Sequence, residues 1–256
     1  MPKFFVTSKQ INNDKIEIIG EDVKHIKNVL RKRVGDKLNI GNNENCKNYL
    51  CEIIYIHEKQ IDCRILEETE ENNESNIKVT VFQGLPKTDK MELVIQKSVE
   101  LGVYDITPVE MQRCVVKFNE KDKIKKINRW QKISEVASKQ SGRNIIPQIN
   151  PIIKTKDICN LCGEYDIVLV AYEKEENNTL KEELKRLKVL EKEELKIAIV
   201  IGPEGGISIE EIDMLKESGI KTVTLGKRIL RTETVALSVL SIVMYELEKD
   251  SKMFLK

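Results

Sequence analysis

A turn between a strand and a helix, late in the chain, constrains the fold more than any other feature. The apolar run at residues 197–201 stops at GPEGG, residues 202–206, and a helix start follows, with Ser208 as N-cap and Glu211 three residues later. Glycines in such a loop let a ligand approach the backbone, while Pro203 fixes one φ angle and removes one donor. The loop therefore predicts either a backbone-lined binding site or an ordinary glycine-rich turn.

A second β-rich segment, residues 223–225, ends in a similar way. It opens at Gly226 into RILRTET, residues 228–234, which leads directly into a long apolar helix. The carboxyl ends of parallel strands share one edge of a sheet, and helix N-termini there offer unpaired N–H groups. Neither loop matches the phosphate-binding loop or the dinucleotide fingerprint. The pair of loops favours a binding site for another kind of ligand.

Strands and helices alternate through the second part of the chain. Strand patterns at residues 77–82, 105–109 and 165–172 are separated by helical patterns at residues 89–101 and 127–140. Parallel strands need a crossover connection, and a helix usually provides it. This alternation predicts an α/β domain with a mainly parallel sheet.

Two later helices differ in their surfaces. Residues 179–194 carry leucines on one face and Lys and Glu elsewhere, as an amphipathic surface helix does. Residues 232–248 have hardly any polar face in their first three turns, so this helix is expected to be buried all round. We expect it to lie in the centre of the domain and also to pack on a second subunit.

The first quarter of the chain has a different pattern. Short β-like runs suggest a small barrel, and they lie at residues 4–6, 15–19, 37–40, 49–56 and 61–66. A helix with one basic side is expected at residues 21–33, which suits an RNA-docking module. The acidic stretch at residues 67–76 is typical of a linker, so we predict two domains, residues 1–72 and 73–256.

The charge of the chain is informative only in its distribution. The net charge is +1, but from Arg113 to Arg143 ten Lys or Arg stand against three Asp or Glu. Such a tract could grip phosphates, or it could be a solvated helix face.

Cysteine and histidine usage argues against a metal site. Six cysteines without a secretion signal indicate reduced thiols in a cytoplasmic protein. Cys159 and Cys162 have a suspicious spacing, but a zinc site needs further ligands, and His25 and His57 are the only histidines. No run approaches the length of a membrane span.

The two loops also carry a family resemblance. IGPEGG at residues 201–206 and LGKRILRTET at residues 225–234 resemble the paired motifs of the bacterial 16S ribosomal RNA uracil-N3 methyltransferases of the SPOUT superfamily. The similarity covers nearly the whole chain, and it includes KTDK at 87–90, ELGV at 100–103 with Pro108, Arg129-Trp130, QSGR at 140–143 with Pro147, and residues 25–35. Val235 departs slightly, where alanine is common, and this affects packing more than chemistry.

The resemblance implies a fold and a reaction. It implies an amino-terminal PUA-like β-barrel for RNA docking, a SPOUT domain with a carboxyl-terminal trefoil knot, and a homodimer. It further implies transfer of a methyl group from S-adenosylmethionine to N3 of one uridine in 16S ribosomal RNA of the small subunit, without a metal. Because the sulfonium is already activated, positioning is expected to supply most of the acceleration.

The resemblance also assigns site residues. Main-chain groups of three loops are expected to hold S-adenosylmethionine, and these loops contain Ala171, Tyr172, Glu173, Gly202, Pro203, Glu204, Gly205, Gly206, Leu225, Gly226, Ile229, Leu230 and Thr234. RNA contacts are expected from Lys24, His25, Arg31, Arg33, Lys87, Arg113, Arg129 and Arg143. For His25 an ordinary packed or surface position is favoured over a catalytic role, and Gln140 with Arg143 could instead shape the catalytic pocket.

Three charged residues are candidates for catalysis. Arg231 could stabilise the uracil anion through its planar fork of donors, or clamp a phosphate. Glu204 and Glu233 are candidate bases, although Glu204 could brace its loop or hold the donor's ammonium group. Glu233 lies in the first turn of a helix, where a carboxylate is favourable for dipole reasons alone. We expect Arg231 to be the principal catalytic residue.

Two other functions remain open from the sequence. A ribose 2′-hydroxyl methyltransferase of the same superfamily would share the donor loops but would need help to deprotonate an alcohol. A non-catalytic RNA-binding assembly factor would keep the fold without affinity for the donor. The modified nucleoside and donor binding distinguish these alternatives.

Overall fold

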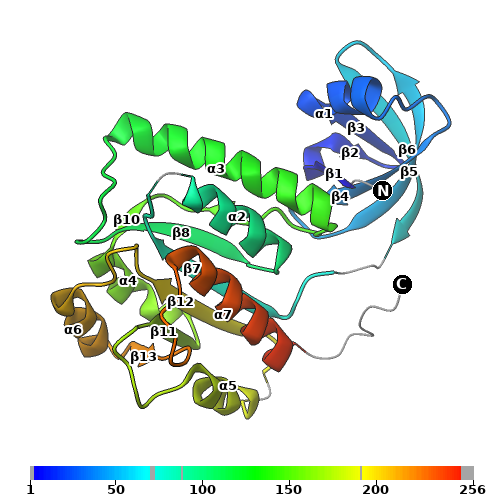
Figure 1. Ribbon diagram of the computed structural model, residues 1–256. Coiled ribbons are helices and arrows are strands. Elements are labelled where there is room, and N and C mark those ends of the chain that lie inside the picture. Colours follow the sequence, from blue (N-terminus) through cyan, green and yellow to red (C-terminus); the bar gives the residue numbers. More distant parts are fainter. Residues whose placement is uncertain (1–2, 70–72, 88, 191, 249–256) are drawn as a thin grey trace. The chain divides into compact units, whose positions relative to one another are not determined.

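The chain forms two compact units in a computed structural model that describes residues 3–69, 73–87, 89–190 and 192–248 (Figure 1). The smaller unit contains Met1–Glu74 and Ser138–Ile146, and the larger contains Ser75–Ala137 and Pro147–Lys256. Residues 138–146, which the sequence analysis left in the carboxyl-terminal part, thus pack with the amino-terminal one. Part of the predicted linker, residues 70–72, lies outside the described residues.

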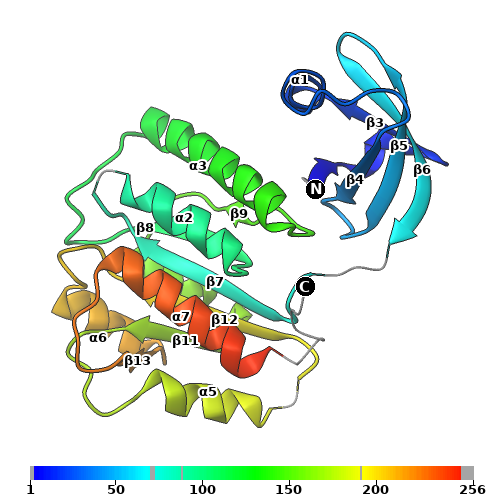
Figure 2. The ribbon, with the colours of Figure 1, turned by 45° about the vertical axis from the view of Figure 1, so that its right-hand side comes forward.

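The smaller unit is built on one mixed sheet of six strands. Its order is β1-β4-β5-β6-β3-β2, with β1 parallel to β4 and the other neighbours antiparallel. Figures 1 and 2 show this sheet curled on itself, which confirms the PUA-like expectation. The strands are β1 (Lys3–Val6), β2 (Ile11–Asn12), β3 (Lys15–Ile19), β4 (Lys37–Asn42), β5 (Asn48–Ile56) and β6 (Gln60–Thr69).

Alternating side chains of these strands make the core of the smaller unit. Every second residue of β1 and of β3 is buried, as a half-buried sheet requires. Core residues of the sheet and of the helix beside it include Phe4, Ile16, Ile26, Leu38, Ile40, Ile53 and Ile61, each at most 1% exposed. The predicted strands are therefore confirmed, with their ends shifted by a few residues.

The helix of the smaller unit is shorter than predicted. It begins as α1 (Glu21–Lys24) after Gly20, and it continues as a π-helical turn over His25–Val29. Arg31 then adopts a left-handed conformation with φ of 52°, which ends the helix before residue 33. The predicted linker also starts too early, because β6 continues to Thr69 and pairs with β5 there.

The larger unit contains a parallel sheet, as the alternating pattern predicted. The order is β10-β8-β7-β12-β11-β13, with β9 beside β8, and every pairing is parallel. The strands are β7 (Ile77–Gly84), β8 (Asp105–Glu110), β9 (Gln148–Ile149), β10 (Ile153–Lys154), β11 (Ile167–Ala171), β12 (Leu195–Ile201) and β13 (Lys221–Val223). The trefoil knot stays a prediction.

The helices of the larger unit cover both faces of this sheet. Helices α2 and α7 pack against each other over β7 (Figure 2), while α4 packs against α6 (Figure 1). The helices are α2 (Lys90–Glu100), α3 (Glu120–Ser141), α4 (Thr155–Leu161), α5 (Leu180–Lys188), α6 (Ile209–Glu217) and α7 (Thr232–Leu247), and the last residues of α3 belong to the smaller unit.

Two helix boundaries differ from the predictions. Helix α3 begins seven residues before residue 127, because the Asn119 side chain accepts the amide of Asp122 at 2.9 Å and caps a polar first turn without an apolar signal. Helix α5 ends at Lys188 rather than at residue 194, because the chain must already enter β12 at Leu195.

Helix α7 has one buried face and one exposed face within the single chain, so burial of the second face against another subunit stays a prediction. Ala236, Val239, Leu240 and Val243 are at most 1% exposed and face the core. Tyr245, however, is 82% exposed within the single chain, and Ile242 on the same helix is 41% exposed. The apolar character of α7 therefore has two causes, a buried face and a second face that the chain itself leaves uncovered.

Candidate functional site

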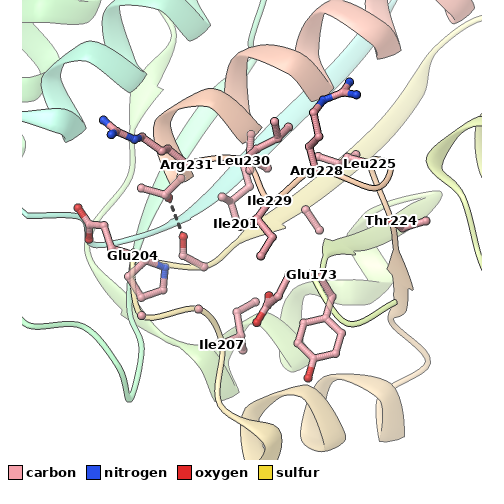
Figure 3. Close-up of a pocket in the computed structure, with 18 of the residues that line it drawn as sticks. Glu173, Ile201, Glu204, Ile207, Thr224, Leu225, Arg228, Ile229, Leu230 and Arg231 are labelled. Atoms are coloured by element: carbon pink, nitrogen blue, oxygen red, sulfur yellow. Dashed lines mark hydrogen bonds between the residues drawn. The ribbon is translucent and has the colours of Figure 1, made fainter. Parts of the chain in front are cut away.

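Three neighbouring strands of the larger unit end at one cavity of about 550 Å³ (Figure 3). The loops that follow β11, β12 and β13 meet there because these strands are adjacent and parallel. The lining residues are Lys90, Ala171, Tyr172, Glu173, Ile201, Gly202, Pro203, Glu204, Gly205, Gly206, Ile207, Thr224, Leu225, Gly226, Lys227, Arg228, Ile229, Leu230, Arg231, Thr232 and Val235. The two loops singled out in the sequence thus border a single space.

The structure brings together the donor-binding residues predicted from the sequence, with one exception. All of them line the cavity except Thr234, whose exposed side chain lies in the first turn of α7. The sequence analysis missed several lining residues, and these are Lys90, Ile201, Ile207, Thr224, Lys227, Arg228, Thr232 and Val235. Four of them lie inside the two motifs, namely Ile201, Lys227, Arg228 and Thr232, and three more directly flank the motifs, namely Ile207, Thr224 and Val235. Taking each motif whole with one residue on either side would have found all but Lys90.

The glycine-rich loop is packed tightly against its surroundings. A Cβ atom at Gly202 would lie 2.8 Å from Cγ1 of Ile207, and one at Gly84 would lie 2.7 Å from the Pro203 ring. Gly206 has φ of 70°, which disfavours any side chain. These glycines are therefore required by the fold of the loop as well as by any ligand that approaches it.

Buried hydrogen bonds tie the first loop to the start of α7. The Thr232 hydroxyl donates to the Gly202 carbonyl at 2.6 Å, and the Gln83 amide donates to the Thr232 hydroxyl at 2.8 Å. Thr232 is 6% exposed and Gln83 is fully buried. This chain of bonds holds Arg231 at the N-cap position of α7 with its side chain exposed at the mouth of the cavity (Figure 3).

Lys90 of α2 reaches the same mouth and pairs with two carboxylates. Its Nζ lies 3.0 Å from Glu204 Oε1 and 3.4 Å from Glu233 Oε2. The hydrogen bond to Glu204 is the main cause that raises the pKa of Lys90. One ammonium group therefore neutralises both candidate bases. Lys90 closes the KTDK motif at residues 87–90, but nothing in its spacing indicated this role.

The environment of Glu204 favours the bracing role over the role of a base. Its two carboxylate oxygens lie 3.1 and 3.2 Å from the Lys87 amide nitrogen, which donates to them. Burial raises the pKa of Glu204, but hydrogen bonds from its own amide, from Lys90 and from Lys87 outweigh burial, so the pKa lies below its ordinary value. A carboxylate with a lowered pKa accepts a proton poorly.

Charged side chains stand on two sides of the cavity. Arg228 and Arg231 project on the side of α7, and Glu173 lies opposite them (Figure 3). The Glu173 carboxylate comes within 3.1 Å of the position that a Cβ of Gly206 would occupy. Arg113 approaches from the loop after β8, and its guanidinium donates to the Gly205 carbonyl at 3.2 Å.

The residues predicted to contact RNA are divided between the two units. Lys24, Arg31 and Arg33 are exposed in the smaller unit, where half-buried His25 stacks edge-on against Phe4 at 5.9 Å. In the larger unit Lys87 and Arg113 lie beside the glycine-rich loop. Arg129 lines a separate shallow groove between α2 and α3, and Arg143 lies in the smaller unit, where it is 5% exposed.

The basic tract between Arg113 and Arg143 is partly neutralised by acids from elsewhere in the chain. The Arg129 guanidinium lies 2.8 Å from Glu92, Lys139 lies 2.6 Å from Asp22, and Arg143 lies 2.5 Å from Glu74. Lys123 lies 3.7 Å from Glu110. The charge excess counted along the sequence therefore overstates the positive surface.

Three of the six cysteines, Cys51, Cys63 and Cys114, are buried in the two hydrophobic cores. All six lie within the described residues and are thiols. Burial raises the pKa of Cys51 and of Cys63 to about 12, so neither forms a reactive thiolate. Cys162, at the suspicious spacing from Cys159, points its sulfur to the Cys159 carbonyl at 3.0 Å.

The described ranges contain neither a candidate metal cluster nor a membrane-spanning helix. In those ranges no three His, Cys, Asp or Glu side chains gather into a group that could hold a metal ion. None of the helices described combines the length and apolar character that crossing a membrane requires.

Comparisons with known proteins agree with the two-part architecture. A family model described as an RNA methyltransferase domain matches residues 73–244, and one described as an RNA methyltransferase PUA domain matches residues 18–66. The ribosomal RNA small subunit methyltransferase E of Bacillus subtilis (strain 168) is 36% identical over 97% of this chain and 98% of its own. The protein of the same name from Mesomycoplasma hyopneumoniae (strain 232) is 34% identical over 94% of this chain and 98% of its own.

A solved structure shows the same fold. The crystal structure of a ribosomal RNA small subunit methyltransferase E from Neisseria gonorrhoeae, bound to S-adenosyl methionine, matches with a TM-score of 0.81 and 30% identity, covering 96% of this chain and 97% of that one. These matches confirm the resemblance that the two loop motifs indicated. The chain belongs to the RNA methyltransferase family that includes ribosomal RNA small subunit methyltransferase E.

Proposed function

We propose that this protein methylates N3 of a specific uridine in 16S ribosomal RNA of the small ribosomal subunit, with S-adenosylmethionine as donor. The observation that carries the proposal is the cavity built from the loops after three adjacent parallel strands. Relatives named for methylation of small-subunit ribosomal RNA, and one bound to this donor, support it.

The cavity suits S-adenosylmethionine in size and chemistry. Its volume of about 550 Å³ lies within the usual range for small-molecule sites. Apolar side chains such as Ile201, Ile207 and Ile229 can cover a flat ring, while the glycine-rich loop offers main-chain donors and acceptors. The Glu173 carboxylate supplies the charge that the donor's ammonium group requires. When bound, the donor supplies a methyl group already activated by its sulfonium.

Arg231 is the residue that we assign to catalysis. It is an exposed cation at the cavity mouth, and its place is fixed by the Thr232 hydrogen bonds. Loss of the N3 proton leaves a uracil anion, and a guanidinium fork stabilises such an anion with directed donors. Glu233 is retained as the candidate base, since the lowered pKa of Glu204 suits it to bracing the loop.

RNA docking is assigned to exposed cations of both units. We propose Lys24, Arg31 and Arg33 with His25 in the smaller unit, and Lys87, Arg113 and Arg129 in the larger one.

We also propose a homodimer that covers the exposed face of α7, which carries Ile242 and Tyr245. We further propose a trefoil knot in the carboxyl-terminal domain and two domains, residues 1–72 and 73–256. A ribosomal RNA substrate implies a cytoplasmic location.

The decisive experiment is transfer of a labelled methyl group to small-subunit particles that lack the modification, followed by nucleoside mapping. We expect label in 3-methyluridine of 16S ribosomal RNA. Label in a 2′-O-methylated nucleoside would show the other chemistry. Calorimetry with S-adenosylmethionine covers the remaining alternative, because a non-catalytic assembly factor would release no heat of binding.

A further inference from the structure

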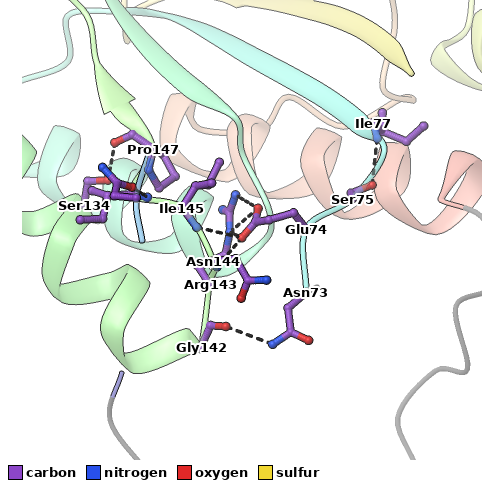
Figure 4. Close-up of polar contacts among 12 residues, drawn as sticks. Asn73, Glu74, Ser75, Ile77, Ser134, Gly142, Arg143, Asn144, Ile145 and Pro147 are labelled. Atoms are coloured by element: carbon purple, nitrogen blue, oxygen red, sulfur yellow. Dashed lines mark hydrogen bonds and ion pairs between the residues drawn. The ribbon is translucent and has the colours of Figure 1, made fainter. Parts of the chain in front are cut away.

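A buried ion pair in the smaller unit holds together two segments that are far apart in the sequence (Figure 4). The Arg143 guanidinium donates from Nε to both Glu74 oxygens at 3.0 Å and from Nη2 to Oε2 at 2.5 Å. Glu74 Oε1 also accepts the amides of Asn144 at 2.7 Å and Ile145 at 3.3 Å. We call this group, Glu74 with residues 143–145, the clasp.

The clasp is the centre of a wider polar attachment of residues 138–146. Asn73 donates to the Gly142 carbonyl at 3.1 Å, and Lys3 donates to the Asn144 side chain at 2.5 Å. The Ile146 amide donates to Asn43 at 2.8 Å, and Lys139 pairs with Asp22. The hydrophobic core of the smaller unit includes no residue of this segment. Polar contacts therefore carry its attachment.

The clasp lies where the chain passes between the two units. The chain leaves the smaller unit after Glu74, returns to it at Ser138, and leaves it again after Ile146. Glu74 therefore lies where the first connection begins, and Arg143 lies between the other two connections. A single ion pair thus secures the ends of all three connections within the smaller unit.

We propose that Glu74 and Arg143 are positioning residues for RNA methylation, and that Arg143 is not a phosphate contact. This inference rests on the proposed function. With side chains only 6% and 14% exposed, Arg143 and Glu74 present almost no charge to solvent. Breaking the pair removes the carboxylate that faces the buried Arg143 guanidinium and weakens the attachment of the segment. RNA gripped by the smaller unit is then presented poorly to the methyl donor, while the donor cavity, built wholly from the larger unit, is unaffected.

The variant Glu74→Gln distinguishes a phosphate-binding role of Arg143 from a positioning role, because the two roles predict opposite changes in activity toward RNA. If Arg143 gripped a phosphate, removing the neighbouring negative charge would leave RNA binding equal or tighter. If the pair positions the segment, kcat/KM for small-subunit particles falls roughly tenfold, as for truncation of a buried charged partner. The dissociation constant for S-adenosylmethionine stays within about twofold, and the salt dependence of RNA binding keeps its slope, because no phosphate contact is lost.

The matched control is Glu52→Gln. Glu52 pairs with Arg64 across β5 and β6 in the same unit at 2.7 Å, but Arg64 is 53% exposed. This variant makes the same change of net charge at a surface pair, so its kcat/KM should stay within about twofold of the parent. Equal losses in the two variants would mean that charge rather than the clasp causes the effect.

Hydrogen exchange tests the clasp without RNA or donor. The amides of Asn144 and Ile145 should exchange at least about tenfold faster in Glu74→Gln than in the parent, since their acceptor is weakened. Arg143→Lys, which keeps the charge but loses the fork, provides a second variant if Glu74→Gln does not fold. Unchanged exchange together with unchanged or improved kcat/KM would overturn the inference. If the parent itself did not methylate particles, the proposed function would fail, but the exchange result would still decide whether the clasp exists.

Discussion

The proposed donor cavity and the basic tract at residues 113–143 differ in how well the sequence predicted them. Loop motifs located the cavity, whereas the number of charges did not predict where the basic residues lie. The cavity residues are grouped in the sequence, and adjacent parallel strands bring their groups to one edge. The tract is also continuous in the sequence, yet the structure distributes it over two units and pairs its charges with Glu92, Asp22 and Glu74. A motif on a loop keeps its meaning because its residues stay together at the end of one strand. A charge count does not, because the partners of each charge come from elsewhere.

The largest effect is expected from Arg231→Ala, which tests the cavity side of this comparison. Removing one donor that stabilises a developing anion should lower the rate of methyl transfer roughly thousandfold. Affinity for S-adenosylmethionine should remain, because the Thr232 hydrogen bonds that shape the loop persist. Single-turnover kinetics and calorimetry measure the two quantities separately. Unchanged turnover would remove Arg231 from the mechanism.

Gly202→Val should abolish donor binding, with a loss of affinity above about a hundredfold. The new side chain would start 2.8 Å from Cγ1 of Ile207, so the loop must deform, and overpacking of this kind costs about 1–3 kcal/mol of stability. Gly163→Ala is the control, because a Cβ there meets no atom within 4 Å. Calorimetry and thermal unfolding should show normal affinity and stability for the control. A Gly202→Val protein that binds the donor normally would place the site elsewhere.

Glu204→Gln should have a smaller effect that depends on pH. The lowered pKa of Glu204 means that its contribution to stability is present above its ordinary value of 4.5 and is lost as pH falls through the folded-state pKa. Urea unfolding near neutral pH should show a loss on the order of 1 kcal/mol in the variant, and the difference from the parent should vanish well below pH 4.5. A rate of methyl transfer that falls a hundredfold in the variant would instead identify Glu204 as the base.

Much of the larger unit could be predicted from the sequence because its signals are local. Period, capping residues and loop motifs located the strands and the donor loops, and even the missed Ile207 and Thr224 adjoin predicted residues. Lys90 and the clasp could not be found in this way. Their partners are separated in the sequence by 114 residues for Lys90 and Glu204 (204 − 90) and by 69 for Arg143 and Glu74, and only the folded chain brings them together.

The exposed face of α7 was hidden from the sequence for a different reason. An apolar residue has the same pattern whether its own chain or another surface covers it, so Tyr245 and Ala236 could not be distinguished. Similarly, nothing in the count of Lys and Arg separates Arg113, beside the glycine-rich loop, from Arg143 in the clasp. Burial distinguishes them, and burial depends on the fold.

The smallest effect is expected from replacing one arginine in the tract at residues 113–143. This prediction tests whether the number of charges in the tract predicts RNA binding. Arg113→Gln, at the glycine-rich loop, should reduce the slope of log affinity for RNA against log salt by about 1, as expected for one lost phosphate contact. Arg129→Gln should change the slope less, because Glu92 already pairs with its guanidinium at 2.8 Å. Filter binding of 16S ribosomal RNA at several salt concentrations measures both slopes. Equal slopes for the two variants would mean that an arginine paired within the protein can still bind an RNA phosphate. The number of Lys and Arg in the tract would then be a valid predictor of its phosphate contacts.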